Sequence, residues 1–104
     1  MKAVIRPAAR HDILSQFLYL IEDGSPGVAE RFVTAIEESI SKVTENPYIG
    51  APKVFKHPGL RGLRHWPVKG FEVVQIYYLV EKDVLRVIRI LHGKRDVSKV
   101  LGRA

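Results

Sequence analysis

The sequence predicts an α+β domain with the element order β-α-α-β-β-β, in which a helical hairpin packs on one face of an antiparallel sheet. Apolar residues recur at helical spacing in two consecutive segments before residue 46. After residue 63 the chain changes to runs rich in Val, Ile, Tyr and Trp that are separated by short turns. With 104 residues, 46% of them hydrophobic, the chain has the size and composition of one compact domain, residues 1–104.

The first helix is predicted at residues 8–23. A short β-prone run at residues 2–6 precedes it. Pro7 suits the first turn, because the N–H that proline lacks would be unpaired there anyway. The apolar positions that form the expected buried stripe are Ile13, Leu14, Phe17, Leu18, Leu20 and Ile21.

A second helix follows after a short break. Gly24 ends the first helix, since a residue without a Cβ takes the left-handed C-cap conformation cheaply. Ser25 and Pro26 restart the helix as N-cap and first-turn proline. Its expected buried face consists of Val28, Phe32, Ile36, Ile40 and Val43. The short connection predicts an antiparallel hairpin, which Asn46 and Pro47 close.

Residues 47–62 carry three prolines and three glycines, so we expect a loop there. Three strands are predicted after it, at residues 63–68, 71–80 and 84–92. The two segments between these strands have the right length for hairpin turns, which makes the three strands an antiparallel meander. The N-terminal strand is expected to join the sheet at an edge or beside the last strand.

The composition excludes several classes of protein. The chain has no cysteine, so neither a disulfide framework nor a thiolate metal site is possible. Its longest apolar run is too short to cross a bilayer, and residues 1–6 lack the long apolar segment of a signal peptide. We therefore expect a cytoplasmic protein that does not contact a membrane.

The net charge of +6 is unevenly distributed along the chain. Residues 1–52 hold 5 Lys/Arg and 7 Asp/Glu, a net −2, whereas residues 53–104 hold 12 and 4, a net +8. A basic half suggests a face for an anionic partner, either nucleic acid or an acidic protein segment. The alternative is that the lysines and arginines only solvate edge strands.

Both faces of the last predicted strand are largely apolar. Alternation places Val84, Arg86, Ile88, Ile90 and His92 on one face and Leu85, Val87, Arg89 and Leu91 on the other. Since the helices cover one face, apolar residues on the second predict that a partner protein or a second copy covers it. Tyr77 and Tyr78 are adjacent, so one of them is expected on the open face. The alternative is that isolated apolar residues are simply exposed there, as on most small sheets.

The segment His92-Gly93-Lys94-Arg95-Asp96 follows the last predicted strand and brings a histidine and two cations to the rim of the sheet. Such a set can grip a phosphate and transfer a proton. In the structural alternative, Gly93 turns the chain and Asp96 pairs locally or caps a short C-terminal helix.

Other chemical sites have little support. His57, His65 and His92 show no i,i+4 spacing and no accompanying carboxylate cluster, so neither a metal site nor a cofactor is expected. Trp66 is interpreted as a core or interface anchor. No glycine-rich phosphate loop, nucleophile elbow or paired carboxylate site is present in the sequence.

The segments RPAARHDILSQFLYL, ENPYIGAP, GLRHWPVKGFEVVQIYYLV and VLRVIRILHGKRD, in this order and spacing, cover residues 6–96. Together they resemble the ParE toxins of the ParE/RelE superfamily of type II toxin–antitoxin systems. The resemblance implies a β-α-α-β-β-β fold and a ParD-like antitoxin whose C-terminal segment wraps the toxin. Such an antitoxin would cover the open face in a hetero-oligomer, and the expected antitoxin contacts are Trp66, Tyr77 and Tyr78.

Two mechanisms are implied by this resemblance. RelE-type members resemble ribonucleases that cleave mRNA on the ribosome, and cleavage by 2′-OH attack needs a base, cations for the phosphate and an acid. Among the residues that such members use, only Arg95 clearly matches in this chain. Val74 or Gln75 stands in the region of a central-strand arginine, and Leu101 stands near the expected tyrosine.

Because most of the residues that RelE-type members use are missing, the resemblance favours the ParE branch. That resemblance implies an inhibitor that binds DNA gyrase and traps the cleaved DNA complex without doing chemistry itself. The expected target contacts are Arg64, Arg89, Lys94 and Arg95. The alternative is a ribosome-dependent mRNA endonuclease with His65 or His92 as base and Arg61, Arg64 and Arg95 as phosphate clamps. A third reading is a degenerate, non-toxic member that only binds the antitoxin.

Overall fold

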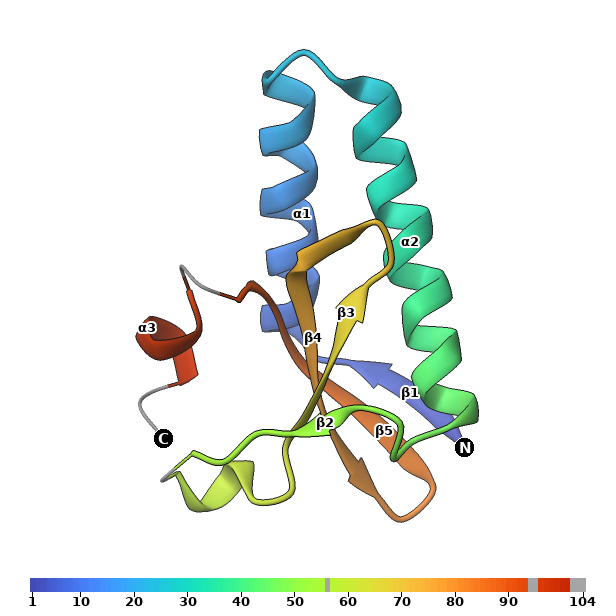
Figure 1. Ribbon diagram of the computed structural model, residues 1–104, viewed down its shortest axis with the longest axis vertical. Coiled ribbons are helices and arrows are strands. Elements are labelled where there is room, and N and C mark those ends of the chain that lie inside the picture. The colour runs from blue at the N-terminus through green and yellow to red at the C-terminus, as the bar shows by residue number, and fades with distance from the viewer. Residues whose placement is uncertain (56, 94–95, 102–104) are drawn as a thin grey trace.

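The computed structural model describes residues 1–55, 57–93 and 96–101. The strands are β1 (Lys2–Ile5), β2 (Ala51–Pro52), β3 (Arg64–Val68), β4 (Phe71–Glu81) and β5 (Val84–His92). The helices are α1 (Pro7–Glu22), α2 (Pro26–Glu45) and α3 (Val97–Leu101), and a single 3-10 turn, η1, spans Pro58–Leu60. The predicted α+β fold and its order of elements are confirmed, with β2, η1 and α3 as short additions (Figure 1).

The strands form one sheet in the order β1-β5-β4-β3-β2. The meander of β3, β4 and β5 is antiparallel, as predicted, and β2 pairs antiparallel with β3. β1 lies beside the last strand but runs parallel to it, from Lys2 opposite Val84 to Ile5 opposite Val87. The expectation of a wholly antiparallel sheet is therefore wrong at this edge, because the long segment between β1 and β5 provides the crossover that parallel pairing needs.

The hairpin of α1 and α2 covers one face of the sheet (Figure 1). The main core between these layers includes Ala9, Phe32, Ile36, Val43, Val68, Ile76, Tyr78, Leu85, Val87 and Ile90. Leu14, Leu18 and Ile21 remain 53%, 47% and 39% exposed, so their predicted place in the buried stripe is wrong. α1 rests on the sheet through the face that carries Ala9 and Asp12, which turns both leucines outward. No helix in the described part of the chain has the length and apolar character needed to cross a membrane.

The opposite face of the sheet is partly covered by the chain itself. Phe55, Leu60 and Leu63 of the loop after β2, together with Val97 and Leu101 of α3, form a second cluster with Tyr77, Leu79, Ile88 and Leu91 of the sheet. Tyr77 is only 2% exposed. The expectation that this face is open is therefore wrong over much of its area, because the proline- and glycine-rich loop folds back across it.

A β-bulge interrupts the pairing of β4 with β5. Tyr77 lies opposite Arg89 while the next residue, Tyr78, lies opposite Val87, so Ile88 is the extra residue of β5. Past the bulge the side chains change faces: Ile90 joins the main core and Leu91 the second cluster. The simple alternation predicted for this strand is wrong beyond Ile88, since a bulge re-aims the side chains that follow it.

A buried tyrosine fixes the turn that leads into β2. The Tyr78 hydroxyl donates to the Pro47 carbonyl at 2.8 Å and accepts from the Gly50 N–H at 3.0 Å. A Cβ at Gly50 would overlap the Tyr78 phenol and would lie 2.8 Å from the His65 carbonyl oxygen. Glycine is required at this position because the backbone and the phenol approach so closely.

Gly50→Ala is expected to lower the free energy of unfolding by about 2 kcal/mol, because the added methyl group forces the Tyr78 phenol away from its hydrogen bonds. Urea denaturation followed by circular dichroism measures this change. The matched control is Gly27→Ala in α2, where a Cβ meets its nearest neighbour, Arg31, at 3.6 Å. This control should retain or gain stability. Equal stability of Gly50→Ala and the wild type would contradict the prediction.

Candidate functional site

Asp12 of α1 and Arg89 of β5 form a partly buried ion pair. Arg89 donates from Nε to Asp12 Oδ2 and from Nη2 to Asp12 Oδ1, both at 2.7 Å. Asp12 is 8% exposed, whereas the Arg89 side chain keeps 26% of its surface in contact with solvent. The hydrogen bond to Asp12 raises the pKa of Arg89, against the opposing effect of burial. The paired geometry is that of a charge-assisted, bidentate contact, the strongest class of side-chain hydrogen bond.

Side chains from the same region of α1 also form hydrogen bonds with the backbone of β5. The Ile90 N–H donates to Asp12 Oδ2 at 3.0 Å, and Gln16 Nε2 donates to the Ile90 carbonyl oxygen at 3.0 Å. β1 ends at Ile5, opposite Val87, so beyond that point these α1 side chains occupy the edge of β5. They satisfy backbone groups that a neighbouring strand would otherwise pair.

Asp12 carries no predicted role, and the apolar pattern gives no signal for it. The buried stripe predicted for this helix is centred near Phe17 and Ile21, whereas Ala9, Asp12 and Gln16 line a different side of the helix. Its partner is 77 residues away, on a strand whose side chains change faces at a bulge. The apolar pattern therefore indicates neither the buried acid nor its partner Arg89.

Arg64, expected to contact the target, is bound within the fold. Its Nη1 donates to the Gly50 carbonyl at 2.7 Å and to the Tyr48 carbonyl at 3.2 Å. The guanidinium lies 5.1 Å from the centroid of the Tyr48 ring, within the range of a cation–π contact. Arg64 thus ties the turn before β2 to β3.

His65 follows Arg64 in β3, so its side chain points to the other face of the sheet from that of Arg64. There it contacts Gln75 and Tyr77. Its Nδ1 lies 2.8 Å from Gln75 Oε1, and its ring stacks on Tyr77 with centroids 5.7 Å apart. Gln75 Nε2 donates to the Glu72 carbonyl at 2.7 Å, which directs the amide oxygen toward the histidine. Since that oxygen can only accept, His65 carries its hydrogen on Nδ1.

His92 lies apart from His65. It lines a mostly apolar pocket of about 330 Å³ together with Gln16 and Tyr19 of α1. The structure therefore does not gather His65, His92 and Arg64 into one constellation, and the remaining predicted residues, Lys94 and Arg95, lie outside the described residues. Across residues 1–55, 57–93 and 96–101, no group of His, Cys, Asp and Glu could hold a metal ion.

The three residues expected to contact an antitoxin differ in accessibility. Trp66 is half-buried and lines a pocket of about 430 Å³ with Ser39 and Lys42 of α2. Tyr77 and Tyr78 are 2% and 0% exposed, each inside a core cluster of this chain. Burial raises the pKa of both tyrosines, and for Tyr78 the hydrogen bond from Gly50 and the charge of Arg64 partly oppose the rise.

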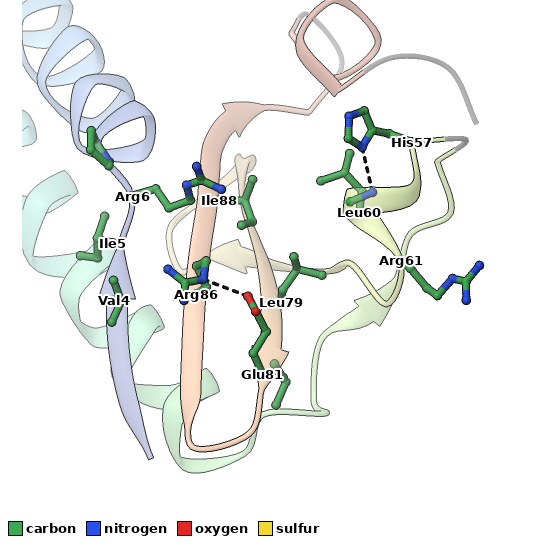
Figure 2. Close-up of a pocket in the computed structure, with 13 residues that line it drawn as sticks. Val4, Ile5, Arg6, His57, Leu60, Arg61, Leu79, Glu81, Arg86 and Ile88 are labelled. Carbon is green, nitrogen blue, oxygen red and sulfur yellow. Dashed lines mark hydrogen bonds and ion pairs between the residues drawn. The ribbon is translucent and has the colours of Figure 1, made fainter.

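A pocket of about 670 Å³ lies on the far face of the sheet, between η1 and the junction of β1 with α1 (Figure 2). Its lining combines the apolar side chains of Leu60, Leu79 and Ile88 with the basic side chains of Arg6, Arg61 and Arg86. Arg86 Nε donates to Glu81 Oε1 at 2.9 Å in an exposed ion pair. Arg61, expected as a phosphate clamp in the endonuclease alternative, lines this pocket, which neither His65 nor His92 lines.

Asp12→Ala and Arg89→Ala are each expected to lower the free energy of unfolding by about 2 kcal/mol, a loss moderated by the partial exposure of Arg89. The double variant should cost little more than either single one, because the second truncation removes a group that is already unpaired. Urea denaturation of all three variants gives the coupling energy. Glu81→Ala and Arg86→Ala, which break the exposed pair, are the controls and should cost less than about 1 kcal/mol. Additive costs for Asp12 and Arg89 would contradict the prediction.

Tyr77 and Tyr78 are expected to ionise only above the ordinary tyrosine pKa of 10.0 while the chain is folded. The unfolded chain then loses protons first as the pH rises. Their contribution to stability is complete below pH 10.0 and falls as the pH passes through that value toward the folded pKa values. A pH titration of tyrosinate absorbance, with circular dichroism to monitor folding, tests this. A single ionisation step near 10.0 for all tyrosines of the folded chain would be the contrary result.

Comparisons with known proteins identify the family and the fold. A family model described as "ParE toxin of type II toxin-antitoxin system, parDE" matches residues 3–97. The fold is similar to a solved chain from "Chromosomal ParDE TA system from P. aeruginosa", with 17% sequence identity and a TM-score of 0.74, over 90% of this chain and 97% of that one. A comparison with curated proteins finds no match. Because the family model spans most of the sequence, the chain belongs to the ParE toxin family of type II toxin–antitoxin systems.

Proposed function

We propose that this ParE toxin inhibits DNA gyrase in the cytoplasm by binding to it, and that a ParD-like antitoxin neutralises it in a hetero-oligomer. The observation that carries the non-enzymatic part is the dispersal of the candidate catalytic groups. His65 stacks on Tyr77 on one face of the sheet, whereas His92 lines a pocket against α1 on the other. General acid–base cleavage of RNA requires such groups to converge on one phosphate.

The proposed target contacts fall into two groups. Arg64 and Arg89 donate hydrogen bonds to partners within the chain, so we propose that they mainly stabilise the surface that binds the target. Lys94 and Arg95 are the proposed direct contacts. Both are cationic and follow β5, and a cluster of this kind suits an acidic or phosphate-bearing surface.

For the antitoxin, Trp66 is the direct contact that we propose among the three expected aromatic residues. Its half-buried ring at the edge of the 430 Å³ pocket offers apolar area to a partner. The rings of Tyr77 and Tyr78 are enclosed by the chain's own residues in two different clusters, so we propose that they support the antitoxin contacts only indirectly.

One observation favours a second candidate, a ribosome-dependent mRNA endonuclease. The Gln75 amide oxygen accepts only a hydrogen on His65 Nδ1, so in the neutral imidazole Nε2 carries the lone pair. A ring nitrogen with a lone pair is what a general base needs. Arg64, His65, His92 and Arg95 remain the residues for this alternative, and a non-toxic member that only binds the antitoxin is the third.

Incubation of the purified protein with gyrase, supercoiled plasmid and ATP is expected to accumulate linear plasmid after denaturation of the enzyme, because the trapped complex holds cleaved DNA. Lys94→Ala combined with Arg95→Ala should raise the concentration needed by about tenfold, through the loss of charged contacts. Arg31→Ala, which changes an exposed cation on α2, is the matched control and should behave as the wild type.

Three outcomes distinguish the candidates. Linear plasmid supports gyrase inhibition. Its absence, together with site-specific cuts in mRNA on translating ribosomes, supports the endonuclease and predicts that His65→Ala abolishes cutting. Absence of both activities in a chain that still binds its antitoxin identifies a non-toxic member and refutes the proposal.

A further inference from the structure

The chain's own cover over the far face of the sheet stops before it reaches β1. The loop after β2 and α3 pack over Tyr77 and Leu91, whereas the pocket of about 670 Å³ opens between η1 and the start of α1 (Figure 2). A volume of this size lies within the range of sites that enclose a ligand, roughly 300–1,000 Å³. Among the described residues, this pocket is one part of the far face that remains accessible to a partner.

One wall of the pocket is apolar. Leu60, Leu79 and Ile88 belong to the second hydrophobic cluster and also line the pocket, so the cluster continues to its surface. Leu60 and Leu79 are only partly buried. An aliphatic side chain placed against them would remove further apolar area from water, which is favourable.

Two guanidinium groups lie beside this wall. Arg6 has no ion-pair partner among the described residues, and Arg86 pairs only with Glu81 there. The side chains of Arg86 and Glu81 are 36% and 51% exposed, so water and salt weaken their attraction. In Figure 2 the side chains of Arg6 and Arg86 extend over β5, whereas Arg61 points away from the pocket. The pocket therefore has an excess of positive charge next to an apolar wall.

We propose that this pocket docks an acidic and aliphatic segment of the antitoxin, an inference that rests on the proposed toxin–antitoxin function. A carboxylate of that segment accepts hydrogen bonds from Arg6 and Arg86, and a neighbouring aliphatic side chain packs on Leu79 and Ile88. Charge complementarity carries the choice of occupant, since the pocket presents the guanidinium groups of Arg6 and Arg86 against the single carboxylate of Glu81. Arginine is suited to such a contact because its planar fork matches a carboxylate.

The mixed lining distinguishes this occupant from nucleic acid. A DNA or RNA backbone would pair with the arginines but would leave the wall of Leu60, Leu79 and Ile88 without an apolar partner. A protein segment with an acidic residue beside a leucine or isoleucine satisfies both parts of the pocket.

The test measures the affinity of this chain for the protein encoded by the neighbouring small gene, by isothermal titration calorimetry. Arg6→Gln combined with Arg86→Gln is expected to raise the dissociation constant by about tenfold and to reduce its dependence on salt. The matched control, Arg10→Gln combined with Arg31→Gln, removes two exposed cations from α1 and α2 and should leave the dissociation constant unchanged.

Glu81→Gln is expected to change the dissociation constant in the opposite direction. It removes the carboxylate that competes for Arg86 and is expected to lower the dissociation constant by roughly threefold. Poor folding cannot produce tighter binding, so this variant separates docking from a loss of structure. Circular dichroism of each variant monitors the fold.

Equal affinities for the wild type and the Arg6/Arg86 variant would overturn the inference while the toxin–antitoxin proposal stands. The inference is also overturned, with the toxin–antitoxin proposal intact, if the Arg6/Arg86 variant loses affinity for a short duplex oligonucleotide but keeps its affinity for the antitoxin. If the wild type does not bind the neighbouring gene product and does not inhibit gyrase, the proposed function itself fails.

Discussion

The contact between Asp12 and Arg89 is the interaction on which the arrangement of this domain depends. β1 covers the outer edge of β5 only as far as Val87, and beyond it the carboxylate of Asp12 pairs both the Arg89 guanidinium and the Ile90 N–H. Burying a carboxylate is costly, but these three hydrogen bonds satisfy it. These hydrogen bonds attach α1 to the edge of β5 and so help to determine which face of the sheet the helical hairpin covers.

This arrangement holds described cations of the basic half in separate places within the fold. Arg89 is held by α1, and Arg64 is held by the turn before β2. The far face is largely closed by the chain's own loop and α3, with a pocket left near Arg6 and Arg86. The described residues of this ParE toxin thus form separate surfaces, which is the arrangement that the proposed binding function needs.

Much of the fold is predictable from the sequence because local rules determine it. Gly24 and Gly70 adopt φ values of +82° and +85° at the two breaks where turns are expected, and apolar periodicity identifies the helices and the meander. The bulge in β5 and the outward direction of Leu14 depend on contacts between distant segments, which periodicity does not describe. The sequence predicts which residue types could form the candidate site. It does not predict whether a cation such as Arg64 is already hydrogen-bonded inside the fold, because its partners at Tyr48 and Gly50 come near only when the chain folds.

We propose that the free chain covers most of its own sheet and leaves the pocket near Arg6 and Arg86 for the antitoxin. Amide hydrogen exchange of the chain alone and in complex with its antitoxin tests this most directly. The account predicts that Lys53 and Leu63, whose amides are bonded to Leu63 and Leu60 carbonyls, are already protected in the free chain. Antitoxin binding should add protection at residues 4–7 and 57–61. A loop that exchanges freely until the antitoxin is added, or protection gained only on α1 and α2, would contradict the account.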